Sequence, residues 1–192
     1  MPHPLHRRIG EFLREIPLPP DCCLLLAPEC GGDKIALSMF CNARKGSDTR
    51  YCNVDGLIVR RSEICFALEI EESGLNPTKI CGKFLTTALS TNFIHRVLNN
   101  SLTVFNCHLT FVQILDAQKL KERTKKIVQS RELERSIQGI LPIRGASVRD
   151  YRLFVFRGVR GFDDDPETRH AFQQTVVSAC SAPATVADGT AL

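Results

Sequence analysis

The spacing of apolar and polar positions predicts a helix at the start of the chain and then a group of strands. Apolar residues recur at helical spacing over residues 5–16, and three prolines follow, the first at Pro17. Three later apolar runs predict strands, at residues 34–41, 51–59 and 64–71. One short apolar run, residues 22–27, fits either a strand or part of a helix.

The second half of the chain alternates between predicted helices and strands. Asn76 and Pro77 favour a helix start, because Asn can cap the first turn and Pro is tolerated within it. Gly82, inside this helix, would permit a close approach to the sheet. The later segments are a strand at 102–115, a charged helix at 117–140, a strand at 151–156 and a helix at about 165–180.

This order of elements predicts an α/β protein with a mixed central β-sheet flanked by helices. The first three strands fit an antiparallel meander, and the fourth follows a helical crossover, which suits parallel pairing. A chain of 192 residues is long enough for a domain with its own core, which we assign to residues 1–180. Residues 181–192 are small and polar, and we expect a disordered tail there.

The composition indicates a cytoplasmic protein. The net charge of +4 is compatible with a nucleic-acid partner but does not by itself argue for one. Nine cysteines occur without a Cys-x-x-Cys pair, which argues against a zinc ribbon and favours reduced, structural thiols. The N-terminus lacks a signal core and no apolar run approaches the roughly 18 residues of a membrane span, so we expect no membrane partner.

Three acidic residues stand at the open end of a predicted hairpin. Asp55 precedes the apolar part of one strand, and Glu69 and Glu71 end the next. Side chains alternate along a strand, so Glu69 and Glu71 point the same way, and the hairpin can bring Asp55 close to them. Clustered carboxylates repel one another unless a positive charge lies among them, and a hard divalent cation takes oxygen ligands. The pattern therefore predicts a metal site.

The alternative is a solvent-exposed hairpin end that happens to carry acids. Residues 64–68 are almost continuously apolar, which indicates a strand covered on both faces and favours the metal site. Glu11 and Glu15 lie one turn apart on the first predicted helix. A solvated acidic flank is the favoured interpretation of that pair, and an approach to the metal site is the other.

These acids, in this order of elements, resemble the motif of the PD-(D/E)xK nuclease superfamily. That motif has an Asp at the start of the second core strand, here Asp55, and (Asp/Glu)-x-Lys on the third, here Glu69-Ile70-Glu71. The sequence differs from the motif in two places: Val54 replaces the Pro, and Glu71 replaces the Lys. In some family members the Lys has moved to the following helix, where this chain carries Lys79 and Lys83.

The resemblance implies a restriction-endonuclease-like domain that hydrolyses phosphodiester bonds with Mg²⁺ or Mn²⁺. Asp55, Glu69, Glu71 and the Ile70 carbonyl would hold the metal, which lowers the pKa of the attacking water. Lys79 or Lys83 would help to place the water and balance charge at the phosphorus. The implied activity is that of an endonuclease, with DNA as the expected partner and a homodimer as a possible assembly.

Four basic residues are candidates for contact with nucleic acid. Arg44 and Lys45 lie in a polar loop that could form a positive lip, and Arg60 and Arg61 lie in the turn before the third strand. A second hypothesis keeps the same fold but assumes that cleavage has been lost with the motif Lys, which leaves a module that binds nucleic acid or protein. A cysteine–histidine enzyme, built on Cys22, Cys81 or Cys107, is disfavoured against buried structural thiols.

Overall fold

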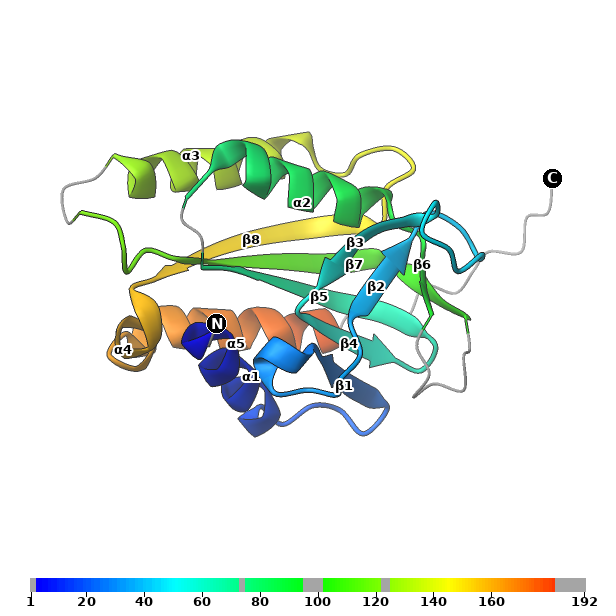
Figure 1. The fold of residues 1–192 in the computed structure, drawn as a ribbon, viewed down its shortest axis with the longest axis horizontal. Coiled ribbons are helices and arrows are strands. Elements are labelled where there is room, and N and C mark those ends of the chain that lie inside the picture. Colours follow the sequence, from blue (N-terminus) through cyan, green and yellow to red (C-terminus); the bar gives the residue numbers. More distant parts are fainter. Residues whose placement is uncertain (1–2, 73–74, 95–101, 122–124, 182–192) are drawn as a thin grey trace.

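A mixed β-sheet between two layers of helices forms the body of the protein (Figure 1). This architecture comes from a computed structural model, which describes residues 3–72, 75–94, 102–121 and 125–181. Helices α1 (Pro4–Glu15), α4 (Gly158–Asp163) and α5 (Pro166–Ser181) cover one face. Helices α2 (Pro77–Leu89) and α3 (Lys126–Ile140) cover the other. The expected α/β class, with a mixed sheet flanked by helices, is confirmed.

Five strands form the main sheet, in the order β1-β4-β5-β7-β8. The strands β1, β4 and β5 pair antiparallel, whereas β5, β7 and β8 pair parallel. Helix α2 lies between β5 and β7 in the chain, as the expected helical crossover to a parallel neighbour requires. Their bounds are Cys22–Leu26, Gly56–Arg60, Glu63–Glu71, Leu102–Asp116 and Val148–Phe156.

Three shorter strands extend the sheet beside the first part of β7. They are β2 (Leu37–Phe40), β3 (Arg50–Val54) and β6 (Asn92–Ile94). Strand β7 is 15 residues long, and its beginning pairs with β6 while its later part pairs with β8. The two groups of strands therefore share one continuous strand.

Strand β5 is buried on both faces, as its apolar run predicts. Phe66 and Leu68 pack with α1 and α5, whereas Ile64 and Ala67 belong to the core under α2 and α3. A strand with two covered faces has no room for unpartnered charge. Glu69 and Glu71 at its end are nonetheless only 7% and 8% exposed.

The predicted strand at 51–59 is wrong as one element, because the chain breaks at Asp55. The first part, β3, pairs with β2, and the second part, β4, pairs with β1 and β5. The antiparallel meander exists in this bent form. The undecided run at 22–27 supplies β1, which lies beside β4.

Further differences concern segments whose local pattern is short or mixed. The predicted helix at 117–140 begins only at Lys126, and residues 118–120 form a turn after β7. The pattern missed β6, α4 and the short 3₁₀ helix η1 (Pro28–Cys30). Gly82 makes no close approach to the sheet, since an added Cβ would have no neighbour within 4 Å.

The described residues also bear on the remaining expectations from composition. Eight of the nine cysteines have described side chains, and all eight are free thiols. Within the described ranges no helix is both long enough and apolar enough to cross a membrane. The expected disordered tail at residues 181–192 lies outside the described residues except for Ser181, which ends α5.

Candidate metal centre

A cleft of about 510 Å³ opens where β5 ends and β4 begins, and we call it the acid cleft. In open α/β sheets, ligands commonly bind at the carboxyl ends of strands, which is where this cleft lies. It contains the three acids that the sequence singles out and the two lysines of α2. Its lining is His3, His6, Glu29, Asp55, Glu69, Ile70, Glu71, Glu72, Lys79, Lys83 and Lys119.

Asp55 occupies the break between β3 and β4, and its backbone and side chain both hydrogen-bond to β5. The Asp55 N–H donates to the Leu68 carbonyl at 2.8 Å, and the Ile70 N–H donates to Asp55 Oδ2 at 2.7 Å. The side chain thus takes the place of a backbone carbonyl where the β4 ladder ends. The Asp55 carbonyl accepts from Ala27 N–H at 2.8 Å, which also fixes the chain after β1.

Glu69 and Glu71 both face helix α2, as residues two apart on a strand should. Lys83 Nζ lies 2.5 Å from Glu69 Oε1, and Lys79 Nζ lies 2.5 Å from Glu71 Oε2. The two lysines are one helical turn apart, so each reaches one glutamate. Asn76 caps α2 by accepting from the N–H groups of Thr78 and Lys79, and so fixes the start of this helix.

The electrostatics of the acid cleft differ from those of a surface ion pair. Burial, and then the negative charge of Asp55, raise the pKa of Glu69 to about 7, although Lys83 opposes this change. Burial acts to lower the pKa of Lys83, but the nearby carboxylates of Glu69 and Asp55 raise it overall. Asp55 and Glu69 are therefore close enough for their charges to repel each other, as clustered metal ligands do without an ion.

Helix α1 contributes His6 to the cleft, a residue that sequence reasoning missed. His6 Nδ1 lies 2.7 Å from Glu72 Oε1, and His6 Nε2 lies 3.5 Å from Asp55 Oδ2. Burial acts to lower the pKa of His6, but hydrogen bonds and charges from Asp55 and Glu72 raise it to about 9. The signal that could have found it is the pair His3 and His6, one turn apart at a helix start.

The two glutamates of α1 considered from the sequence do not line the cleft. Glu11 is exposed and pairs with Arg7, and Glu15 is exposed, which fits the solvated flank. Sequence reasoning also missed Glu29 of η1, Lys119 of the turn after β7, and Glu72. The sequence pattern predicts a helix at Lys119, because the charged segment after residue 117 continues into the residues that form α3.

The four basic residues predicted to contact nucleic acid lie away from the acid cleft. Arg60 ends β4 and Arg61 lies in the turn that follows, at the other end of the β4–β5 hairpin, and both pair with Asp21. Arg44 and Lys45 are exposed in the loop between β2 and β3, and Arg44 pairs with Asp48. None of the four is among the described residues that line the cleft. Their role with nucleic acid stays a prediction.

The acids of the cleft are of the type that a hard divalent cation takes, but Asp55, Glu69 and Glu71 are not among the described groups of three whose ligand atoms all lie within 4.8 Å of one another. Asp55, Glu69 and Glu71 offer carboxylate oxygens within one cleft, and Ile70, whose carbonyl is the fourth candidate ligand, also lines it. Oxygen ligands of this kind suit Mg²⁺ or Mn²⁺. Lys79 and Lys83 would have to give up part of their pairing with the glutamates for an ion to enter.

Comparison of the chain with protein-family models, with curated proteins and with solved structures found no match in any of the three.

Proposed function

We propose that this protein is a metal-dependent nuclease that hydrolyses phosphodiester bonds in DNA. The observation that carries the proposal is the gathering of Asp55, Glu69 and Glu71 in one cleft with Lys79 and Lys83. Phosphodiester hydrolysis needs an activated water and positive charge opposite the phosphorus. The cleft offers ligands for an ion and two cations within reach of the same space.

Each group has a stated role in this reaction. Asp55, Glu69 and Glu71 would hold the cation, with the Ile70 carbonyl as a further ligand. When bound, Mg²⁺ or Mn²⁺ supplies Lewis-acid activation of the attacking water. Lys83, which pairs with Glu69, would face the phosphate and stabilise the charge that develops there.

The layout of the cleft agrees with what the resemblance to the PD-(D/E)xK superfamily implies. Asp55 directly precedes the second strand of the antiparallel series β1, β4, β5, and Glu69 and Glu71 end the third. The lysines of the next helix reach the two glutamates. This arrangement supports the interpretation that the motif Lys has moved from position 71 to α2.

A binding module without cleavage is the second candidate, and one observation favours it. Glu69 and Glu71 each already have a lysine at 2.5 Å, so much of their charge is balanced without an ion. A scaffold that had lost its metal could keep such pairs as structural contacts. Metal binding alone does not distinguish the nuclease from the binding module. A cleavage assay is needed as well.

The experiment combines calorimetric titration and cleavage on the untagged, metal-stripped chain. Mg²⁺ and Mn²⁺ are titrated into the wild type, Glu69→Gln and Glu63→Gln. Glu63 begins the same strand at the end away from the cleft, so its variant is the matched control. We expect metal binding and nicking of supercoiled plasmid in the wild type and in Glu63→Gln, and loss of both in Glu69→Gln.

The other outcomes divide the candidates. Metal binding without cleavage of DNA or RNA refutes the nuclease and supports the binding module. Cleavage of RNA alone would overturn the choice of DNA. Cleavage that Glu69→Gln leaves intact would place the activity outside the acid cleft. Conversion of plasmid to linear rather than nicked product would support the expected homodimer, which sedimentation of the protein then checks.

A further inference from the structure

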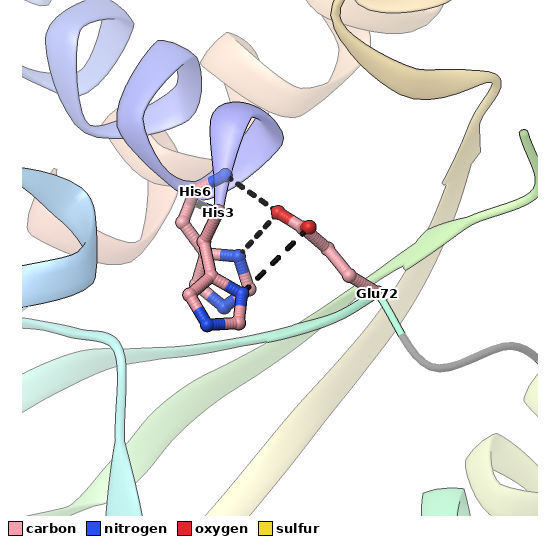
Figure 2. A group of neighbouring side chains, drawn as sticks. All are labelled: His3, His6 and Glu72. Carbon is pink, nitrogen blue, oxygen red and sulfur yellow. Dashed lines mark hydrogen bonds and ion pairs between the residues drawn. The ribbon is translucent and has the colours of Figure 1, made fainter. Parts of the chain in front are cut away.

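Three of the residues that line the acid cleft form a second group of metal-type ligands (Figure 2). His3, His6 and Glu72 each offer one ligand atom, and these atoms all lie within 4.8 Å of one another. His6 Nδ1 is 2.7 Å from Glu72 Oε1, and His3 Nδ1 is 3.7 Å from Glu72 Oε2. We call this group the histidine cluster. It uses none of the three acids assigned to the hydrolytic metal.

The fold holds two of the three side chains in place. Glu72 directly follows β5, and its Oε1 also accepts the backbone N–H of His6 at 3.2 Å, in the first turn of α1. The His6 side chain is buried beside it, whereas the His3 side chain is 44% exposed. The cluster therefore has two fixed ligands and a third that can adjust to an ion.

We propose that the histidine cluster is a binding site for a divalent transition-metal ion of the Zn²⁺ type. Zn²⁺ binds imidazole nitrogen and carboxylate oxygen at about 2.0–2.2 Å, so ligand atoms around a tetrahedral ion lie roughly 3.4 Å apart. The distances of 2.7 Å (His6–Glu72) and 3.7 Å (His3–Glu72) lie on either side of this value. A small rotation of the exposed His3 ring would bring all three ligand atoms to the spacing that the ion requires. Two nitrogens and one oxygen would leave a fourth position for water.

The second nitrogen of His6 supports this assignment. When Nδ1 binds an ion, Nε2 carries the proton, and it points to Asp55 Oδ2 at 3.5 Å. Ligating histidines usually donate their other N–H to a carboxylate, which fixes the tautomer and the ring orientation. Asp55 would thus contact both metal sites, one as a ligand and one as a support for His6.

The two sites should differ in the ions that they accept. Asp55, Glu69, Glu71 and the Ile70 carbonyl offer oxygen ligands alone, which suit Mg²⁺ and Mn²⁺, whereas the imidazoles of His3 and His6 suit Zn²⁺, Co²⁺ and Ni²⁺. The histidine cluster is therefore a separate site, and its existence does not depend on nuclease activity.

The competing interpretation needs no ion. Glu72 then serves only as a cap for α1 and as a partner for the charged His6 ring. This interpretation explains the contacts between His6 and Glu72, but it does not require His3. His3 is therefore the residue whose replacement separates the two interpretations.

The test measures Zn²⁺ binding to the untagged, metal-stripped full chain by calorimetry and, in parallel, the visible absorption of bound Co²⁺. The variants are His3→Ala and Glu72→Gln, which keeps an oxygen that can accept the His6 N–H. His170→Ala, an exposed histidine on α5 outside the cleft, is the matched control. Glu69→Gln disables the acid cleft alone.

We expect one Zn²⁺ per chain in the wild type, with an intense Co²⁺ spectrum typical of tetrahedral coordination. His3→Ala and Glu72→Gln should each weaken Zn²⁺ binding at least tenfold, whereas His170→Ala and Glu69→Gln should leave it unchanged. The proposal is overturned if the wild type binds no Zn²⁺, or if His3→Ala binds it as tightly as His170→Ala. Loss of Zn²⁺ binding in Glu69→Gln alone would also overturn it, because the ion would then belong to the acid cleft.

Discussion

Asp55 accepts the backbone N–H of Ile70 on its Oδ2 at 2.7 Å, so a candidate metal ligand also completes the end of a β-ladder. The structural and chemical roles of this side chain can be separated, because an amide oxygen can replace the carboxylate as acceptor. The geometry of the acid cleft therefore depends on a contact that survives loss of the charge.

Asp55→Asn and Asp55→Ala should therefore differ in stability but not in metal binding. Asn keeps an acceptor for Ile70, and we expect its free energy of unfolding in urea to fall by less than about 1 kcal/mol. Ala leaves that N–H without its partner, at a cost of about 1–3 kcal/mol. Both should weaken Mg²⁺ binding at least tenfold in calorimetry. Equal stability of the two variants would show that the hydrogen bond contributes little.

The stability of the metal-free protein should fall as pH rises, for two reasons with the same sign. The pKa of Glu69 is raised to about 7 in the fold from an ordinary value of 4.5, so the folded state loses stability between these pH values. The pKa of His6 is raised from 6.5 to about 9. Its contribution is complete below pH 6.5 and is lost as pH rises through about 9.

Urea unfolding at a series of pH values in EDTA measures this effect. Glu69→Gln should remove the decline between pH 4.5 and 7, which amounts to roughly 3 kcal/mol at most. The decline in stability above pH 6.5, which comes from His6, should remain in this variant. Glu63→Gln is the control and should follow the wild type. A Glu69→Gln profile parallel to that of the wild type would contradict the raised pKa of Glu69.

Removal of a lysine should strengthen metal binding while it weakens cleavage. Lys83 is the more buried of the two lysines and pairs with the most perturbed acid, so Lys83→Met should raise the affinity for Mg²⁺ several-fold. It should also reduce plasmid nicking at least 100-fold, because the cation that we propose to face the phosphate would be lost. Lys79→Met should change the Mg²⁺ affinity and the nicking rate in the same directions but by less, because Lys79 is more exposed.

Calorimetry and initial nicking rates on both lysine variants make this comparison. Weaker Mg²⁺ binding in Lys83→Met would mean that the lysine supports the ion rather than competes with it. Unchanged nicking in both variants would remove the lysines from the reaction.

Two glycines in the helices beside the cleft should respond in opposite ways to an added methyl group. A Cβ on Gly10 of α1 would lie 2.0 Å from the carbonyl oxygen of Cys30, a backbone atom that cannot move easily. Gly10→Ala should therefore destabilise the protein by about 3 kcal/mol or more and loosen α1, which carries His6. Gly82→Ala meets nothing within 4 Å and should stabilise α2 by about 1 kcal/mol.

Thermal unfolding of the two glycine variants gives this result directly. Destabilisation by Gly82→Ala would contradict the open space around that position. A neutral Gly10→Ala would mean that α1 and η1 can separate without loss.

The acids of the cleft could be foreseen from sequence because strand geometry is strongly constrained. Alternation along β5 requires that Glu69 and Glu71 share a face, and the cap at Asn76 fixes where the lysines of α2 begin. These inferences need only local spacing and one hairpin. The same reasoning gave the parallel crossover from β5 to β7.

The remaining parts depend on contacts between distant segments, which local spacing does not reveal. His6 meets Glu72 across 66 positions of the chain, and nothing near either residue indicates the other. The break at Asp55 arises because β3 and β4 have different partners, and the turn pair Asp55-Gly56 is its local signal inside an otherwise strand-like run. Gly82 was misjudged because a helical pattern does not show which glycine faces a neighbour.

Strand β7 passes through both groups of strands without interruption, and this limits how the molecule can deform. A hinge between the small and the large group would have to bend β7 between Phe105 and Thr110, where its register against β5 shifts. From Thr110 to Leu115, β7 is paired on both sides with β5 and β8, so the large group should move as one body. Lys79 and Lys83 would then respond to a ligand by side-chain reorientation around a stationary frame.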